Sequence, residues 1–281
     1  MDLVINDCRL NVEVLGEKGK PVLIGLHGGG GIGSLDEPKQ TFGALADLFH
    51  VVVFDMRGCG KSEGVPPYSH EQWAADVDAI RHWLGAEKVV VAGGSYGGFI
   101  SLEYAVRYPD RVSGIILRDT SPDNQNFETL VENAKVHAEG RVTINWDNFH
   151  RYWEGKITSD QDLKERWAEL IPLYDKNYDA FASAAKVEAG FYRYEAHNAC
   201  MSINKPNYDV KPFLPKITAP TLITVGRHDW VTPVASSETI HRLIPNSELV
   251  IFENSGHSPQ SEEGELFQKT LRSFISAHHL A

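Results

Sequence analysis

One serine in this chain lies in a pattern that is typical of a catalytic nucleophile. Ser95 stands at the centre of Gly93-Gly94-Ser95-Tyr96-Gly97 and follows the apolar run 89–92, which predicts a buried parallel strand. A sharp turn from a strand into a helix exposes a serine hydroxyl, and glycines at 93 and 97 let neighbouring main chain approach closely. Such a pentapeptide can also be a simple turn. The strand before it and the helix predicted over 99–108 favour a nucleophile.

A serine hydroxyl is a weak nucleophile, so it needs a base, and the base needs an acid that orients it. Asp229 follows the predicted strand 222–225, and His257 follows the predicted strand 249–252. Both side chains therefore belong at the carboxyl ends of strands. The order Ser95, Asp229, His257 is the order expected when the nucleophile lies on a Gly-x-Ser-x-Gly turn. We predict that these residues form a catalytic triad.

Three other residues compete for these roles. His228 adjoins Asp229, and neighbours on a short loop would point apart, which disfavours it as the base. Asp123 is the other plausible acid, and Asp119, closer to the end of strand 114–117, is interpreted as structural.

A tetrahedral oxyanion needs two preorganised donors. One is the backbone N–H of Tyr96, directly after the nucleophile. The second is predicted in the glycine run 28–31, with Gly29 as the first choice and Gly28 as the next. A phosphate-binding loop is the competing interpretation of this run, but no Lys-Ser/Thr pair follows it. His27 is interpreted as a structural, hydrogen-bonding histidine.

Composition limits the class of protein. The 281 residues are 42% hydrophobic, which fits one large domain, or one domain with a sizeable insertion. The net charge is −11 with Lys and Arg scattered, which argues against a nucleic-acid or membrane surface. The start lacks the features of a signal peptide and no apolar run is long enough to span a bilayer, so a cytoplasmic enzyme is the default expectation.

Cysteine usage predicts neither a disulfide framework nor a metal site. Cys8, Cys59 and Cys200 are an odd number, far apart, and no pair has metal-ligand spacing. Reduced and partly buried thiols are expected. We predict no metal and no cofactor, and a small-molecule or short-peptide substrate as the partner; the oligomeric state is left open.

Buried strands alternate with amphipathic helices along most of the chain. Leu10, Val12 and Val14 alternate as in an antiparallel edge strand, and short apolar runs at 22–26, 51–54, 89–92, 114–117, 222–225 and 249–252 predict buried parallel strands. Helices are predicted over 71–84, 233–243 and 262–277. The alternation indicates an α/β fold, a doubly wound sheet with helices on both faces.

The alternation stops between residues 122 and 212. This segment holds three of the six tryptophans, Trp146, Trp153 and Trp167, and helical patterns over 127–138, 160–170 and 176–189. We interpret it as a helical cap over the carboxyl ends of the strands, with 1–121 and 213–281 as the core. A separate interaction domain is the alternative, disfavoured because both flanks lead directly into strands.

Taken together, these residues resemble the α/β-hydrolase fold, and within it the proline iminopeptidase branch of serine peptidases. The resemblance spans most of the chain. Three segments carry it. His27-Gly28-Gly29-Gly30-Gly31 is similar to that branch's His-Gly-Gly-Pro-Gly, and Gly93 to Gly98 is the second segment. The third, Asp55-Met56-Arg57-Gly58-Cys59-Gly60-Lys61-Ser62, is similar to Asp-x-Arg-Gly-x-Gly-x-Ser. The resemblance implies a mostly parallel eight-stranded sheet with the cap between strands six and seven. Asp55 and Arg57 are expected to form a buried ion pair that holds the glycine loop.

A fourth segment, Arg193-Tyr194-Glu195-Ala196-His197, resembles the family's Arg-x-Glu-x-His. The resemblance implies that Glu195 binds the free α-amine of a substrate, and an ammonium entering a closed site does need a carboxylate. The alternative is that Glu195 pairs with Arg193 or faces solvent.

Two departures from the pattern bear on the substrate. Gly30 stands where the family has proline. Between residues 196 and 237 the only carboxylates are Asp209 and Asp229, and Trp230 follows the predicted triad aspartate, where its ring would suit a neutral apolar substrate.

The sequence therefore predicts a serine hydrolase that acts through an acyl-enzyme. Release of an N-terminal proline or small residue is the first hypothesis. Hydrolysis of a small neutral ester, amide or lactone is the alternative, and a non-enzymatic binding protein on the same scaffold is the third.

Overall fold

A computed structural model describes residues 1–124 and 127–281. Its centre is an eight-stranded sheet in the order β1-β2-β4-β3-β5-β6-β7-β8, as the resemblance implied. The strands are β1 Asp2–Ile5, β2 Cys8–Leu15, β3 Val22–Leu26, β4 His50–Phe54, β5 Val89–Gly94, β6 Val112–Arg118, β7 Thr221–Gly226 and β8 Ser247–Phe252.

Six strands, β3 to β8, run parallel, and β2 runs antiparallel to both of its neighbours, β1 and β4. Every residue of β3 and β5 is buried, which explains why these strands read as continuous apolar runs. The prediction that the strand around Leu10 and Val12 lies at the edge is wrong. It pairs with β4 on one side and with β1 on the other, and β1 is too short and too exposed at Val4 to have been recognised.

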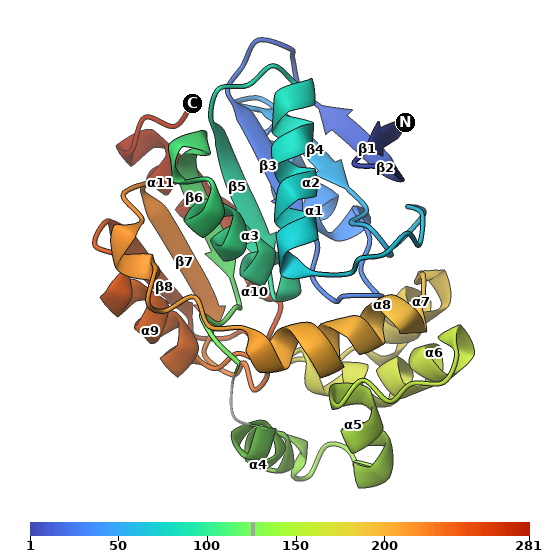
Figure 1. Cartoon of the computed structure of the whole chain (residues 1–281). Helices are drawn as coiled ribbons and strands as arrows, with labels where there is room; N and C mark the ends of the chain where they lie inside the picture. The colour runs from blue at the N-terminus through green and yellow to red at the C-terminus, as the bar shows by residue number, and fades with distance from the viewer. Residues whose placement is uncertain (125–126) are drawn as a thin grey trace.

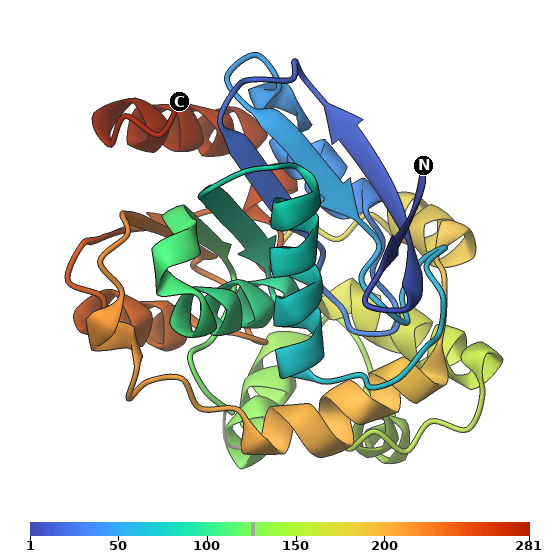
Figure 2. The same cartoon turned by 45° about the horizontal axis from the view of Figure 1, so that its top comes forward.

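Helices cover both faces of the sheet, as predicted (Figures 1 and 2). Apolar side chains of α2, α3 and α9 belong to one buried cluster, and those of α1 and α11 to a second cluster. The core helices are α1 Asp36–Phe42, α2 His70–Trp83, α3 Tyr96–Arg107, α9 Val234–Leu243, α10 Pro259–Glu262 and α11 Gly264–Ala277. The C-terminal helix, predicted as one element, is thus divided between α10 and α11.

A helical insertion separates β6 from β7 and lies beyond the carboxyl ends of the parallel strands (Figures 1 and 2). Its helices are α4 Phe127–Ala138, α5 Trp146–Trp153, α6 Asp160–Leu170, α7 Ala180–Ala189 and α8 Tyr194–Ala199, followed by a π-helical turn at Cys200–Asn204. The bounds of α4 and α6 agree with the sequence prediction, while α5 was not predicted. We keep 122–212 as the proposed extent of the cap.

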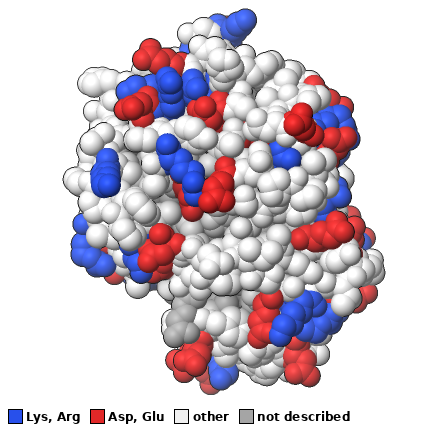
Figure 3. Space-filling model, in the orientation of Figure 1, with Lys and Arg blue, Asp and Glu red and all other residues white. Residues whose placement is uncertain are grey.

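The surface agrees with the composition. Basic and acidic side chains are interspersed on the face shown in Figure 3. In the part of the chain that the structure describes, no helix has the length and apolar character needed to cross a membrane. Cys8, Cys59 and Cys200 are all free and buried.

Candidate active site

Ser95 lies at the tight turn that joins β5 to α3. Its backbone has φ 52° and ψ −121°, a combination that non-glycine residues rarely adopt. A Cβ atom on Gly93 would lie 2.4 Å from the Gly97 carbonyl oxygen, and one on Gly97 would lie 2.6 Å from the carbonyl oxygen of Leu26. The two glycines therefore serve the purpose that the sequence suggested: they allow the close main-chain packing that holds the serine in this conformation.

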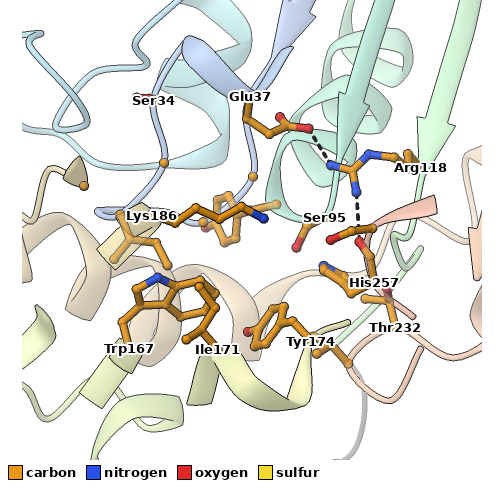
Figure 4. A pocket seen from close by; sticks show the side chains of 18 of the residues that line it. Ser34, Glu37, Ser95, Arg118, Trp167, Ile171, Tyr174, Lys186, Thr232 and His257 are labelled. Atoms are coloured by element: carbon orange, nitrogen blue, oxygen red, sulfur yellow. Dashed lines mark hydrogen bonds and ion pairs between the residues drawn. The ribbon is translucent and has the colours of Figure 1, made fainter. Parts of the chain in front are cut away.

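His257 lies within the same cavity as Ser95, and both side chains point into it (Figure 4). Its Nδ1 atom is 2.8 Å from Oδ2 of Asp229. Its other ring nitrogen, Nε2, has no hydrogen-bond partner among the described residues. The histidine is thus oriented by Asp229 through one nitrogen and presents the other for a proton transfer.

Asp229 is fully engaged as an acceptor. The backbone N–H groups of Val231 and Thr232 donate to its Oδ1 at 2.8 and 3.1 Å, and the Thr232 hydroxyl donates to its Oδ2 at 2.7 Å. Burial alone would raise the pKa of Asp229, but the His257 charge and these hydrogen bonds outweigh it and lower the pKa. Burial would likewise lower the pKa of His257, and the Asp229 carboxylate reverses that effect, so the pKa is raised.

The competing residues have other partners. Asp123 forms an ion pair with Lys211, and His228 is exposed and donates its backbone N–H to the Ser255 carbonyl oxygen at 3.0 Å. Asp119 is buried beside the triad, and burial, reinforced by the charge of Asp229, raises its pKa to about 7. It accepts from the Gly226 N–H at 2.9 Å, so its position is consistent with the structural role predicted for it.

The glycine run after β3 lies beside the nucleophile. Gly28 and Gly29 both line the cavity, and a Cβ atom on Gly28 would lie 3.2 Å from Cβ of Ser95. The Tyr96 N–H is the first of α3 and has no acceptor within its own helix. Gly29 and Tyr96, the two predicted oxyanion donors, therefore both line the cavity that contains Ser95, and their role stays a prediction. His27 is buried and structural, since its Nε2 accepts from the Met56 N–H at 3.0 Å.

The cap helix α8 packs directly on this glycine loop. The Arg193 N–H donates to the Gly31 carbonyl oxygen at 2.8 Å, and Nδ1 of His197 lies 3.3 Å from the Gly30 carbonyl oxygen. A Cβ atom on Gly30 would lie 2.1 Å from Sγ of Cys200. The Cys200 thiol thus fills the space that any larger side chain at position 30 would need.

The structure does not support the role predicted for Glu195. Its side chain is exposed and is not among the residues that line the cavity. The reason is helical geometry: Ala196, His197 and Cys200 form the buried face of α8 and the turn after it, which places Glu195 on the outer side. The segment that resembles Arg-x-Glu-x-His packs the cap against the glycine loop, through the contacts of Arg193 and His197.

The expected ion pair between Asp55 and Arg57 is also wrong. Arg57 pairs with Asp76 on α2 at 3.0 Å, and both side chains are buried. Asp55 instead accepts the Leu35 N–H at 2.6 Å and the Lys61 N–H at 2.8 Å. It therefore supports the chain that follows the glycine loop through backbone donors.

The cavity has a volume of about 430 Å³, and its lining combines polar and charged side chains with a group of aromatic ones. These are Tyr96, Phe99, Tyr152, Trp153, Trp167 and Tyr174. Trp230, predicted to contact the substrate, is buried behind them. Its ring centroid lies 6.0 Å from that of Trp153 and 5.8 Å from that of Tyr174, and it is not among the lining residues.

Three charged residues of the cap line the cavity and were not predicted: Asp175, Lys186 and Lys205. Asp175 has one buried carboxylate oxygen, Oδ1, without a hydrogen-bond partner among the described residues. Cap helices carry no strand-end signal of the kind that identified Asp229 and His257. Only the position of Lys186 within the predicted helical segment 176–189 was available from sequence.

The comparisons with known proteins agree with this geometry. Residues 21–264 match the family described as alpha/beta hydrolase fold. The chain is 33% identical to "Proline iminopeptidase PfmaB" of Pestalotiopsis fici, over 96% of this chain and 97% of that protein, and 28% identical to a proline iminopeptidase of Saccharolobus solfataricus, over 90% and 84%. Among solved structures, a thermophilic esterase from Thermogutta terrifontis superposes with a TM-score of 0.76 at 25% identity, over 99% of this chain and 98% of that one.

Proposed function

The chain belongs to the alpha/beta hydrolase family, and from that premise we propose that it is a serine hydrolase that cleaves carboxylic esters or lactones through an acyl-enzyme on Ser95. The observation that carries the proposal is the hydrogen bond of 2.8 Å between His257 and Asp229, with Nε2 of His257 left without a partner among the described residues in the cavity that Ser95 lines. This is the arrangement that a base needs before it takes a proton from a nucleophile.

In the first step Nε2 of His257 takes the proton of the Ser95 hydroxyl while Oγ attacks the substrate carbonyl carbon. The N–H groups of Tyr96 and Gly29 stabilise the oxyanion. The intermediate collapses, and His257 gives its proton to the leaving oxygen. Water then attacks the acyl-enzyme with the same base and releases the acid and the serine.

The cavity walls support an ester or lactone rather than a charged amine. Aromatic side chains form part of the lining, and Glu195, the carboxylate expected to bind an amine, is exposed outside the cavity. An ammonium group that leaves water needs a carboxylate in return. Two of the carboxylates that line the cavity, Glu37 and Asp123, are already paired with Arg118 and Lys211.

Release of an N-terminal proline or small residue is the second candidate. It is supported by the relatives named proline iminopeptidase and by Asp175, whose unpartnered carboxylate oxygen could receive an α-ammonium group. If this candidate is right, Asp175 takes over the role expected of Glu195.

A side-by-side turnover assay tests the two candidates. We expect short-chain 4-nitrophenyl esters and aliphatic lactones to be cleaved with a kcat/KM at least tenfold above that of prolyl- and alanyl-4-nitroanilide. A higher kcat/KM for the prolyl anilide than for its acetylated form and for the esters would favour the peptidase. Absence of fluorophosphonate labelling of Ser95 would contradict both.

A further inference from the structure

Lys205 presents an ammonium group at the cap side of the cavity. It follows the π-helical turn Cys200–Asn204, and with Met201, one turn earlier, it lines the cavity. Its Nζ atom lies 4.7 Å from the centroid of the Trp153 ring. Tyr96 and Phe99, which flank the nucleophile on α3, line the same space. Lys205 is thus part of the chamber into which Ser95 points.

No carboxylate neutralises this ammonium in the described part of the chain, where Nζ of Lys205 makes neither an ion pair nor a hydrogen bond. The aromatic face of Trp153 attracts a cation but carries no net charge. Burial lowers the pKa of Lys205 to about 8, which leaves the group mostly protonated at neutral pH. Lys205 is half-buried, and its ammonium has no anionic partner among the described residues, whereas charges withdrawn from water are normally paired.

The carboxylates that line the cavity are mostly engaged elsewhere. Glu37 is held by Arg118 at 2.6 Å, and Asp123 by Lys211. Asp36 is exposed at the rim, near the hydroxyl of Ser34. Two buried carboxylate oxygens have no hydrogen-bond partner among the described residues: Oε2 of Glu37, whose Oε1 is held by Arg118, and Oδ1 of Asp175. Asp175 lies in the loop whose Tyr174 carbonyl oxygen accepts the His257 N–H.

A second cation faces the same space. Lys186 of α7 lines the cavity, and its side chain extends toward the centre in Figure 4. Among the described residues it too has no acidic partner. Two ammonium groups without carboxylate partners therefore face the ligand volume from the cap.

From this placement we propose that Lys205 binds a carboxylate carried by the substrate, so that the enzyme acts on esters or lactones that bear an acidic group. The inference rests on the proposed function for the reaction and adds the charge of the substrate. Lys186, at the more exposed end of the cavity, assists the entry of the anion.

Binding to the Ser95→Ala variant tests the inference apart from turnover. Calorimetry compares 4-nitrophenyl hemiglutarate, which carries a carboxylate on the acyl chain, with uncharged 4-nitrophenyl hexanoate. A second pair, 4-(butyryloxy)benzoate and phenyl butyrate, places the carboxylate on the leaving group. We expect the anionic member of at least one pair to bind at least tenfold more tightly than its neutral counterpart, and this preference to disappear when Lys205→Met is added.

The control is Lys216→Met. Lys216 is also a lysine over an aromatic ring, that of Phe213, but it is exposed and is not among the residues that line the cavity. This variant should keep the preference, and Lys205→Arg should keep most of it. Equal binding of both members in both pairs, or an anion preference that survives Lys205→Met, would overturn the inference. If the anionic esters bind as expected but the wild type never cleaves them, the proposed function fails while the anion site stands.

Discussion

The thiol of Cys200 fills the space next to Gly30, where a Cβ atom would lie only 2.1 Å from Sγ. Gly30 belongs to the loop that carries the predicted oxyanion donor Gly29, and Cys200 follows the cap helix α8. The cap and the glycine loop are therefore packed so closely that there is no room between them for an added methyl group. Interiors packed this closely transmit strain from one element to the next.

Replacing Gly30 with alanine should disturb both stability and catalysis. We expect Gly30→Ala to lower the free energy of unfolding by about 1 to 3 kcal/mol, the usual cost of overpacking, and to lower kcat/KM by displacing the Gly29 N–H. Adding Cys200→Ala should restore part of both quantities, because it removes the atom that clashes. Urea unfolding and ester kinetics on the single and double variants measure this coupling.

Gly264→Ala serves as the control, since a Cβ atom there would meet nothing within 4 Å. Gly30→Ala should cost clearly more stability than this control. Equal losses in the two variants, or no recovery in the double variant, would show that Cys200 and Gly30 do not constrain each other.

The residues of the proposed triad could be placed from the sequence because they follow strands of the sheet. Val89–Gly94 and Thr221–Gly226 are wholly buried, so their apolar runs revealed where the sheet ends and where Ser95 and Asp229 must lie. The short edge strand β1 gave no such signal. Its pattern of mostly exposed and half-exposed residues resembles that of a loop.

The cap side of the site could not be derived in this way. A helix shows which of its faces is apolar, but not what that face packs against. Glu195 was expected to reach the substrate, whereas the buried face of α8 is formed by Ala196 and His197 and rests on the glycine loop. The ion-pair partner of Arg57 was wrong for the same reason: the sequence neighbour Asp55 was expected, and the distant Asp76 is the residue that pairs with it. Long-range pairing is set by packing and leaves no local trace in the sequence.

Ser95→Ala should remove turnover and leave the fold intact. The hydroxyl is the proposed nucleophile, and loss of a triad member costs about 10⁴-fold or more in kcat. The substitution keeps Cβ, so the strained turn gains no new clash. Ester turnover, fluorophosphonate labelling and thermal unfolding of the variant check this. Hydrolysis within tenfold of the wild-type rate would exclude Ser95 as the nucleophile.

The acid side of the pH profile should report His257. Only neutral His257 can take the serine proton, and its pKa is raised by Asp229 in spite of burial. The kcat/KM for an uncharged ester should therefore fall as the pH is lowered through a midpoint above the ordinary histidine value of about 6.5. A midpoint at or below that value would contradict the raised pKa.

Asp119 should contribute to this midpoint through its ionised form, which raises the pKa of His257. Its own pKa of about 7 leaves it only partly ionised near the midpoint, so the expected shift is smaller than that of a full charge. Asp119→Asn removes that charge while its carbonyl oxygen can still accept from the Gly226 N–H. The acid limb should move to lower pH. Asp123→Asn is the matched control, since that carboxylate pairs with Lys211, and it should leave the midpoint in place.

The two carboxylates of the cap should respond differently to an amine-bearing substrate. Glu195 is exposed and outside the cavity, so Glu195→Gln should leave KM for prolyl- and alanyl-4-nitroanilide unchanged within about twofold. Asp175 lines the cavity with an unpartnered oxygen, and Asp175→Asn should raise that KM about tenfold, the effect of losing one charge-assisted hydrogen bond. Acetylated anilides carry no ammonium, so their KM should not change in either variant. A KM that rises only in Glu195→Gln, and only for the free amines, would mean that α8 turns in solution so that its outer face reaches the substrate.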